Sequence, residues 1–143
     1  MSIKIKISRK PVEYDKAISY LEKKVQSLNG QKENELLWIL SHPNTYTAGI
    51  STSSDEIIDK SIKIINTNRG GKITWHGPGQ KIFYFVINLS NRDKDIRKFV
   101  GLIEKIIIDT LKEYKIKSFS DKKNIGIWVK KNKKIKKIAA IGI

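Results

Sequence analysis

The amino-acid sequence predicts an α+β fold in which a mixed or largely antiparallel sheet packs with helices. Two segments place apolar residues at three- and four-residue steps, the spacing of an amphipathic helix. Several shorter runs are continuously apolar or alternate apolar with polar residues, which is typical of strands. These segments follow no steady strand–helix–strand rhythm, so an all-parallel sheet is not indicated. The length of 143 residues suits a single domain over residues 1–143.

The chain begins with a predicted strand followed by a helix. Isoleucine alternates with lysine over residues 3–7, which predicts a short strand. A helix is expected over residues 11–30, because Pro11 suits a first helical turn and Gly30 suits a C-terminal cap. Residues 36–40 form an apolar run that Pro43 stops, and this pattern predicts a buried strand.

The rest of the chain predicts one long loop, one helix and five short strands. Residues 44–60 are polar, and a loop of this length in a small domain is often functional. Residues 93–114 carry the clearest helical stripe, with Asp93 as the expected N-cap. Two final strands are expected to flank a lysine-rich hairpin turn. The expected strands cover residues 62–66, 72–75, 81–89, 125–130 and 137–143.

Composition restricts the chemistry that these residues can perform. The absence of cysteine excludes disulfides, thiolate metal sites and cysteine catalysis within the 143 residues. His42 and His76 are far apart in sequence and lack metal-ligand spacing, so no metal is expected. No apolar run reaches the ~20 residues that span a bilayer, and residues 1–10 lack a signal-peptide core. We therefore expect a cytoplasmic protein without a membrane partner.

A net charge of +15 favours acidic partners such as nucleic acid, anionic membrane or acidic proteins. A general bias toward lysine explains the same charge without any partner, because lysine is abundant throughout the chain. The densest basic run comprises Lys130, Lys131, Lys133, Lys134, Lys136 and Lys137.

Two glycine clusters, Arg69-Gly70-Gly71 and His76-Gly77-Pro78-Gly79, flank a short predicted strand. Glycine lets the backbone approach a ligand closely, so the two clusters could form a wall of backbone N–H groups beside a pocket. Arg69 would then anchor a carbonyl or phosphate, and His76 would form a hydrogen bond. From the spacing alone, two tight turns around a hairpin strand are the favoured explanation of the pattern. Neither cluster matches a nucleotide-binding fingerprint, so no cofactor is expected.

Lys137 directly precedes a strand of small and apolar residues. A lysine at this position can be drawn into a pocket, where desolvation would lower its pKa and its charge would activate a thiol. Lys137 is otherwise simply the last lysine of the basic turn. His42, at a predicted strand end, suits a packing role better than a catalytic one. Trp38, Trp75 and Trp128 fall within predicted strands, which favours core positions.

Three stretches, in order, resemble the lipoyl(octanoyl) transferase family. RGGKITWHGPGQ at residues 69–80 is similar to its RGGxxTxHGPGQ signature. LLWILSHPNTYTAGI at residues 36–50 resembles its LWxxxHPxxYTxG stretch, and IGIWVK with KKIAAIGI resembles its GVWV…KIAAIG region. Residues 1–35 add only a compatible strand and helix. Two departures from the family pattern are Ser41 and Asn68, where the family commonly has acidic residues.

This resemblance implies a fold like that of biotin and lipoate protein ligase catalytic domains. It also implies transfer of an octanoyl group from octanoyl-acyl carrier protein to a lysine of a lipoyl domain. The implied acceptors are the lipoyl domains of 2-oxoacid dehydrogenases and the glycine cleavage H protein, and no nucleic acid is expected. A cysteine first forms the acyl-enzyme in the implied mechanism, and the acceptor lysine then attacks it.

The resemblance also implies roles for particular residues. Lys137 corresponds to the family lysine that lowers the pKa of the nucleophilic cysteine. The implied acyl-binding wall comprises Arg69, Gly70, Gly71, Lys72, Ile73, Thr74, Trp75 and His76. A second implied binding stretch comprises Ala140, Ile141 and Gly142.

The family continues with a segment that contains its Pro-Cys nucleophile motif, whereas this sequence ends at Ile143. We therefore expect a truncated, split or degenerate member whose fold is incomplete at the C-terminus and which cannot form the acyl-enzyme alone. Three alternatives remain: an ATP-dependent lipoate or biotin ligase, a basic nucleic-acid-binding module, and a non-catalytic remnant that binds acyl carrier protein.

Overall fold

A computed structural model describes residues 2–29, 34–92 and 94–142. The chain divides into two compact units, Met1–Asn88 (unit 1) and Leu89–Ile143 (unit 2), and each is described separately. Mixed sheets and two α-helices confirm the predicted α+β class. The expected single domain over the whole chain stays a prediction. No helix in the described ranges is both long and apolar enough to cross a membrane.

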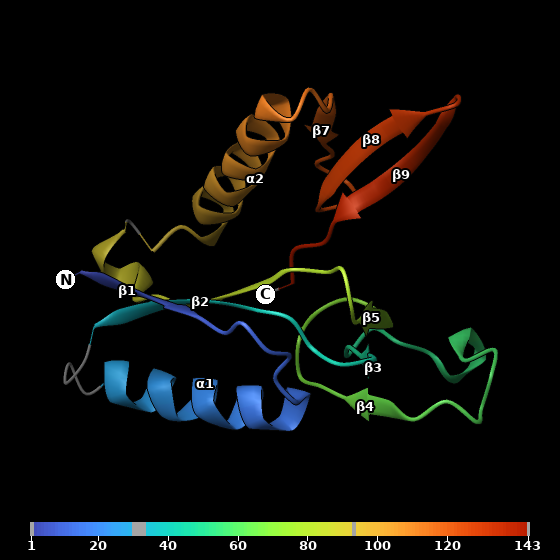
Figure 1. The fold of residues 1–143 in the computed structure, drawn as a ribbon. Coiled ribbons are helices and arrows are strands. Elements are labelled where there is room, and N and C mark those ends of the chain that lie inside the picture. Colours follow the sequence, from blue (N-terminus) through green and yellow to red (C-terminus); the bar gives the residue numbers. More distant parts are fainter. Residues whose placement is uncertain (1, 30–33, 93, 143) are drawn as a thin grey trace. The chain divides into compact units, whose positions relative to one another are not determined.

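The first sheet of unit 1 contains β1 (Ile3–Ile7), β2 (Glu35–Leu40) and β6 (Ile82–Val86), in the order β1-β2-β6. β1 runs parallel to β2, and β6 runs antiparallel to it. Helix α1 (Tyr14–Asn29) lies along this sheet (Figure 1). Its apolar face packs against alternate residues of β2 and β6, as the period of two in a strand requires. The buried core comprises Ala17, Leu21, Leu28, Leu36, Trp38, Leu40 and Val86.

The opposite face of this sheet is also apolar. The register pairs Ile5 and Ile7 of β1 with Leu37 and Ile39 of β2. On their other side, Leu37 and Ile39 pair with Phe85 and Phe83 of β6. On the α1 side of β1, Lys6 lies over aromatic rings, with its Nζ 3.7 Å from the Tyr20 centroid and 4.1 Å from that of Trp38. Lys6 therefore packs over aromatic residues on the α1 side of the sheet.

The second sheet of unit 1 has the order β4-β3-β5. It contains β3 (Thr45–Ala48), β4 (Ile64–Asn66) and β5 (Thr74–His76), and β3 pairs parallel with β4 and antiparallel with β5. The predicted loop over residues 44–60 was partly wrong, because β3 and the 3-10 turn η1 (Ser54–Glu56) lie within it. The two glycine clusters adjoin this sheet.

Unit 2 consists of the turn η2 (Leu89–Asn91), helix α2 (Ile96–Glu113) and an antiparallel sheet. The Asp95 carboxylate caps α2 by accepting hydrogen bonds from the Arg97 and Lys98 N–H groups. The N-cap therefore lies two residues after the expected one. The proposed cap Asp93 lies outside the described residues, as does Gly30. The sheet has the order β7-β8-β9, with β7 (Ser118–Ser120), β8 (Ile127–Lys131) and β9 (Lys134–Ala139).

The β8–β9 hairpin has a tighter turn than the sequence predicts. Asn132 and Lys133 form the two-residue connection, with φ values of 50° and 62°. Two successive positive φ angles are the signature of a type I′ turn, which matches the twist of the flanking strands. The remaining lysines of the basic run therefore lie in the strands. β9 ends at Ala139, so the expected strand over residues 137–143 was too long.

Candidate functional site

The RGGK turn, residues 69–72, is held against the segment that follows β3. The N–H groups of Gly49, Ile50 and Ser51 donate to carbonyls of this turn at 3.0–3.4 Å. A Cβ on Gly49 would lie 2.3 Å from the Gly71 carbonyl oxygen and 2.9 Å from that of Gly70. Only glycine fits this close approach of two backbone segments.

Arg69 uses its guanidinium to brace this turn. Nη2 donates to the Thr47 carbonyl at 3.1 Å, the Thr47 hydroxyl at 2.8 Å and the Lys72 carbonyl at 3.0 Å, while Nη1 donates to the Gly70 carbonyl. Thr47 is fully buried in β3, so the guanidinium joins the turn to the sheet. The structure therefore shows Arg69 bonded to acceptors of its own chain; its predicted contact with a ligand stays a prediction.

The other residues of the predicted acyl wall differ in exposure. The Lys72 ammonium is exposed and pairs with the Glu56 carboxylate of η1. Ile73 and Thr74 are half-buried, whereas Trp75 is 39% exposed and therefore not a core residue. Trp38 is 3% exposed, so the expected core position was right for Trp38 and wrong for Trp75.

The HGPGQ stretch folds into a tight turn that returns Gln80 to His76. The Gln80 N–H donates to the Gly77 carbonyl at 3.1 Å, and Gly79 has a φ of +86°. Proline followed by a positive-φ glycine is the pattern of a type II turn. The Gln80 side chain then lies against His76, with Oε1 2.8 Å from the imidazole Nδ1. Gln80 Nε2 donates to the Trp75 carbonyl at 3.2 Å, which fixes the orientation of the amide.

Four rings gather where β2 and β5 end, and we call Tyr14, His42, His76 and Tyr84 the ring cluster. The two histidines lie 34 positions apart in sequence, yet their ring centroids are 5.8 Å apart. Tyr14, at the start of α1, stacks on His76 with centroids 6.1 Å apart and lies 5.3 Å from His42. Tyr84 of β6 completes the cluster, 5.9 Å from His42.

Hydrogen-bond partners determine which nitrogen of each imidazole carries the proton. His42 is fully buried, and its Nδ1 lies 2.6 Å from the Val12 carbonyl, which can only accept. Nδ1 therefore donates, and in the neutral ring Nε2 accepts from the Tyr84 hydroxyl at 2.9 Å. His76 likewise donates through Nδ1, because the oriented Gln80 oxygen only accepts. Its neutral form therefore presents Nε2 as a hydrogen-bond acceptor and base.

Burial keeps both imidazoles neutral. It lowers the pKa of His42, which the Val12 carbonyl partly offsets and His76 reinforces. It also lowers the pKa of His76, which Gln80 partly offsets and the Arg69 charge reinforces. Burial raises the pKa values of Tyr14 and Tyr84, so both phenols stay protonated. The ring cluster is thus neutral at physiological pH and holds one imidazole base.

Lys137 belongs to unit 2, where it lies on the exposed face of the sheet. Its Nζ donates to the Ile125 carbonyl at 3.0 Å and lies 4.7 Å from the Trp128 ring centroid. Gly126, with a φ of +132°, makes room for the Lys137 side chain, whose Cε would lie 3.2 Å from an added Cβ. The Lys137 side chain is exposed, and its predicted role in a pocket stays a prediction.

The predicted site residues fall in both units. Those at positions 69–76 belong to unit 1, whereas Lys137 belongs to unit 2 together with Ala140, Ile141 and Gly142. The last three follow β9 and lie outside any strand. Sequence reasoning missed Tyr14, Tyr84 and Gln80 as members of the ring cluster and its support. Only Gln80 carried a signal, since it ends the HGPGQ motif.

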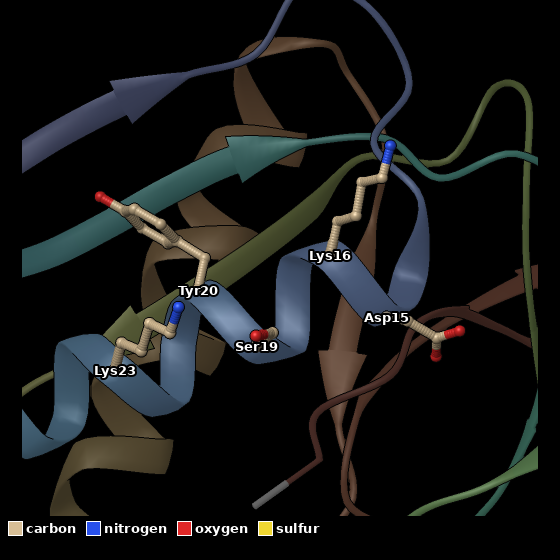
Figure 2. Close-up of a pocket in the computed structure, with 5 residues that line it drawn as sticks. All are labelled: Asp15, Lys16, Ser19, Tyr20 and Lys23. Atoms are coloured by element: carbon tan, nitrogen blue, oxygen red, sulfur yellow. The ribbon is translucent and has the colours of Figure 1, made fainter.

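An open hollow lies along the outer side of α1 and does not contain any predicted site residue. Its volume is about 430 Å³, and its lining comes from one helix (Figure 2). Three lining residues are charged and exposed, so the hollow offers no enclosed apolar slot for an acyl chain. The lining comprises Asp15, Lys16, Ser19, Tyr20 and Lys23.

Comparison with known proteins gives the class of this fold and site. Residues 13–143 match the family model of the lipoyl protein ligase A/B catalytic domain. This match covers most of the chain, and the chain therefore belongs to that family.

Within this family, the chain is similar to curated octanoyltransferases, which are acyltransferases. The chain is 44% identical over 138 residues to an octanoyltransferase of Wolbachia pipientis wMel and 42% identical over 140 residues to one of Ehrlichia ruminantium (strain Gardel). Each alignment covers 96% of this chain and 67% of the relative. An octanoyltransferase of Anaplasma phagocytophilum (strain HZ) is 41% identical over 145 residues, with 70% of its length covered. The chain thus spans about two thirds of these relatives, and the predicted resemblance is confirmed.

A solved structure supports the fold. The crystal structure of P. falciparum LipL1 in complex with lipoate matches with a TM-score of 0.60 and 17% identity. The match covers 99% of this chain and 46% of the other. At this identity the likeness shows the shared lipoate-ligase catalytic fold and nothing finer.

Proposed function

We propose that this chain takes part in octanoyl transfer in lipoate biosynthesis, moving the acyl group from octanoyl-acyl carrier protein toward a lysine of a lipoyl domain. Its kinship with octanoyltransferases supports the reaction class. The observation that carries the proposal is the RGGKITWHGPGQ stretch, whose turns set a neutral imidazole beside an arginine-braced backbone segment. A thioester carbonyl needs a few placed donors, and an amine nucleophile needs a base.

The proposed roles follow the chemistry of acyl transfer. A thioester loses its thiol as the acyl carbon forms a bond to the new nucleophile, and the proton of the attacking group passes to a base. Residues 69–76 would line the octanoyl group, with Ala140, Ile141 and Gly142 as a second binding stretch. Lys137 would lower the pKa of the attacking thiol. The 143 residues contain no cysteine, so a thiol that carries the acyl group is not among them.

The proposal is tested first by binding. Purified chain is titrated with carrier protein in its octanoylated and unacylated forms. Burial of the octanoyl methylenes should strengthen binding by on the order of tenfold or more. Equal affinity for the two forms would contradict octanoyl recognition. A parallel experiment supplies the chain with ATP and free octanoic acid. Formation of an acyl-adenylate would assign the chain to the ligases instead.

The second test follows the acyl group by intact mass. Octanoyl-acyl carrier protein, an apo lipoyl domain and the chain are incubated together, and the masses of all three are measured. We expect no covalent octanoyl adduct on the isolated 143 residues, because they lack a thiol. Octanoylation of the lipoyl domain would show transfer without cysteine, and Lys137→Gln would then be compared with Lys117→Gln, an exposed lysine of the same unit.

A further inference from the structure

We propose that the β8–β9 hairpin is the docking surface for the acidic carrier protein that delivers the acyl group. We define the lysine hairpin as Lys130, Lys131, Lys133, Lys134 and Lys136, all of which are exposed. The inference rests on the proposed function and assigns to one of its partners a specific surface.

The positive charge of the chain is concentrated around this hairpin. Residues 115–143 contain ten lysines and one acidic residue, Asp121, which gives a net charge of +9. The other 114 residues contain 19 basic and 13 acidic residues, a net charge of +6. A uniform lysine bias would place only about +3 of the total +15 in these 29 residues. Compositional bias alone therefore does not explain the hairpin.

The fold brings like charges together without neutralising them. Lys131 and Lys134 are directly opposite across the turn, and like charges at such positions destabilise a hairpin. None of the five hairpin lysines forms an ion pair within the part of the chain that the structure describes. The single carboxylate of the region, Asp121, accepts from the Lys123 N–H and the Asn124 amide. A partner with carboxylates would relieve this repulsion.

The side chains favour an acidic protein over a nucleic acid. Every basic residue from position 115 onward is lysine, whereas arginine is the residue whose planar fork matches phosphate. Single-stranded nucleic acids also bind through open aromatic faces on which bases stack. Trp128 does not offer one, because the Lys137 ammonium lies over its ring and its Nε1 donates to the Asn124 carbonyl.

The same charge favours the acyl donor over the acyl acceptor. The acceptor brings a lysine ammonium to the reaction, and a cationic surface repels that group. The donor carries its acyl group as a neutral thioester, so a cationic surface does not repel its reacting group. Lys137 lies in β9 itself, one residue beyond Lys136 and on the opposite face of the strand, so the docking surface and the proposed catalytic lysine belong to one hairpin.

The test compares two variants with the same loss of charge. The hairpin variant is Lys131→Gln, Lys133→Gln, Lys134→Gln and Lys136→Gln. The control is Lys16→Gln, Lys23→Gln, Lys60→Gln and Lys63→Gln, four exposed lysines of unit 1. Circular dichroism verifies that both fold. Binding to octanoyl-acyl carrier protein is measured by calorimetry from low to physiological salt.

We expect the hairpin variant to bind the carrier about tenfold more weakly, as four exposed ion pairs of modest strength predict. Its affinity should also depend less steeply on salt. The control should stay within about twofold of the unmodified chain. Equal weakening of both variants, or none in the hairpin variant, overturns the inference. Absence of carrier binding at low salt overturns it too. The inference also fails if the hairpin substitutions weaken binding to RNA or to anionic vesicles but leave binding to the carrier unchanged.

Carrier protein without an octanoyl group separates this inference from the proposed function. The hairpin substitutions should reduce the affinity for the unacylated and for the octanoylated carrier by the same factor, because the proposed docking surface does not contact the acyl chain. If the unmodified chain does not prefer the octanoylated carrier but the hairpin effect persists, the proposed function fails and the docking surface stands. If the unmodified chain prefers the octanoylated carrier but the hairpin substitutions do not change affinity, the docking surface fails and the proposed function stands.

Discussion

The two units hold their candidate functional side chains in opposite ways. In unit 1, His42 is fully buried and both of its ring nitrogens have partners, while His76 is half-buried and fixed by Gln80. In unit 2, Lys137 is exposed and its ammonium has one carbonyl partner. Unit 1 carries 13 basic and 8 acidic residues, against 16 and 6 in the shorter unit 2.

This difference separates preorganisation from long-range attraction. A ring held by buried hydrogen bonds keeps its orientation and tautomer before any substrate binds. Exposed lysines instead attract a partner over about a Debye length and tolerate several docking geometries. Substitutions in the ring cluster should therefore change stability strongly, whereas those of exposed lysines in unit 2 should change association.

The largest effect is expected for His42→Leu. It removes the partner of both the Val12 carbonyl and the Tyr84 hydroxyl, whose residues are half-buried. Each unsatisfied group costs about 1–3 kcal/mol, so the free energy of unfolding should fall by roughly 2–5 kcal/mol. Urea denaturation measures the change. The matched variant Lys137→Met should change the free energy of unfolding by less than about 0.5 kcal/mol. A loss as large as that of His42→Leu would show that the two units do not differ in this respect.

Gly126→Ala tests whether unit 2 also contains a position that tolerates no change. The new Cβ would lie 2.6 Å from the Ala139 carbonyl oxygen on backbone with a φ of +132°. We expect a loss of about 2–4 kcal/mol in a thermal or urea melt. Gly101→Ala is the control, because nothing lies within 4 Å of its Cβ. This helical substitution should stabilise the chain by about 0.5–1 kcal/mol.

Arg69→Lys should cost less, roughly 1–3 kcal/mol, because the charge stays while the fork that bridges Thr47 and Lys72 is lost. A double-mutant cycle with Thr47→Val measures how much of this loss runs through the buried hydroxyl. Strict additivity of the two substitutions would show that the guanidinium does not brace the sheet through that contact.

The pH dependence should be the smallest effect. Burial lowers the folded-state pKa values of His42 and His76 below the ordinary value of 6.5. Between the lowered and the ordinary pKa, the unfolded chain binds more protons, so stability rises with pH through this window and levels off above it. Melts from pH 5 to 8 should show this slope. His76→Gln should reduce it, and an unchanged slope would locate the titration elsewhere.

Long or strongly patterned elements could be predicted from the sequence, and short ones could not. β1, β2, α1 and α2 appear close to their expected positions because each carries a clear period. β3 has four residues within a polar stretch and β7 has three, too few for any period to show. β9 ends at Ala139 because its register pairs that residue with Ile127, where β8 begins. Among the described residues that follow, Ala140, Ile141 and Gly142 lie outside any strand.

Part of the candidate site could likewise be predicted from the sequence, and part could not. Tight turns were one of the two explanations that the sequence offered for the glycine clusters, and HGPGQ does form a turn, with Gly79 at a φ of +86°. The proximity of His42 to His76 could not be predicted, since it depends on the pairing of β3 with β5. Tyr84 also looked like one residue of an alternating strand. Only the tertiary fold reveals that its hydroxyl meets a buried imidazole.

The ammonium that lies over the Trp128 ring makes the indole an optical reporter. A cation 4.7 Å from the ring centroid shifts the energy of the excited indole, so fluorescence follows the position and charge of Lys137. With Trp38 and Trp75 replaced by phenylalanine, emission would come from this single indole. The chain thus contains its own spectroscopic probe, which would register acylation or displacement of Lys137 in real time without an added dye.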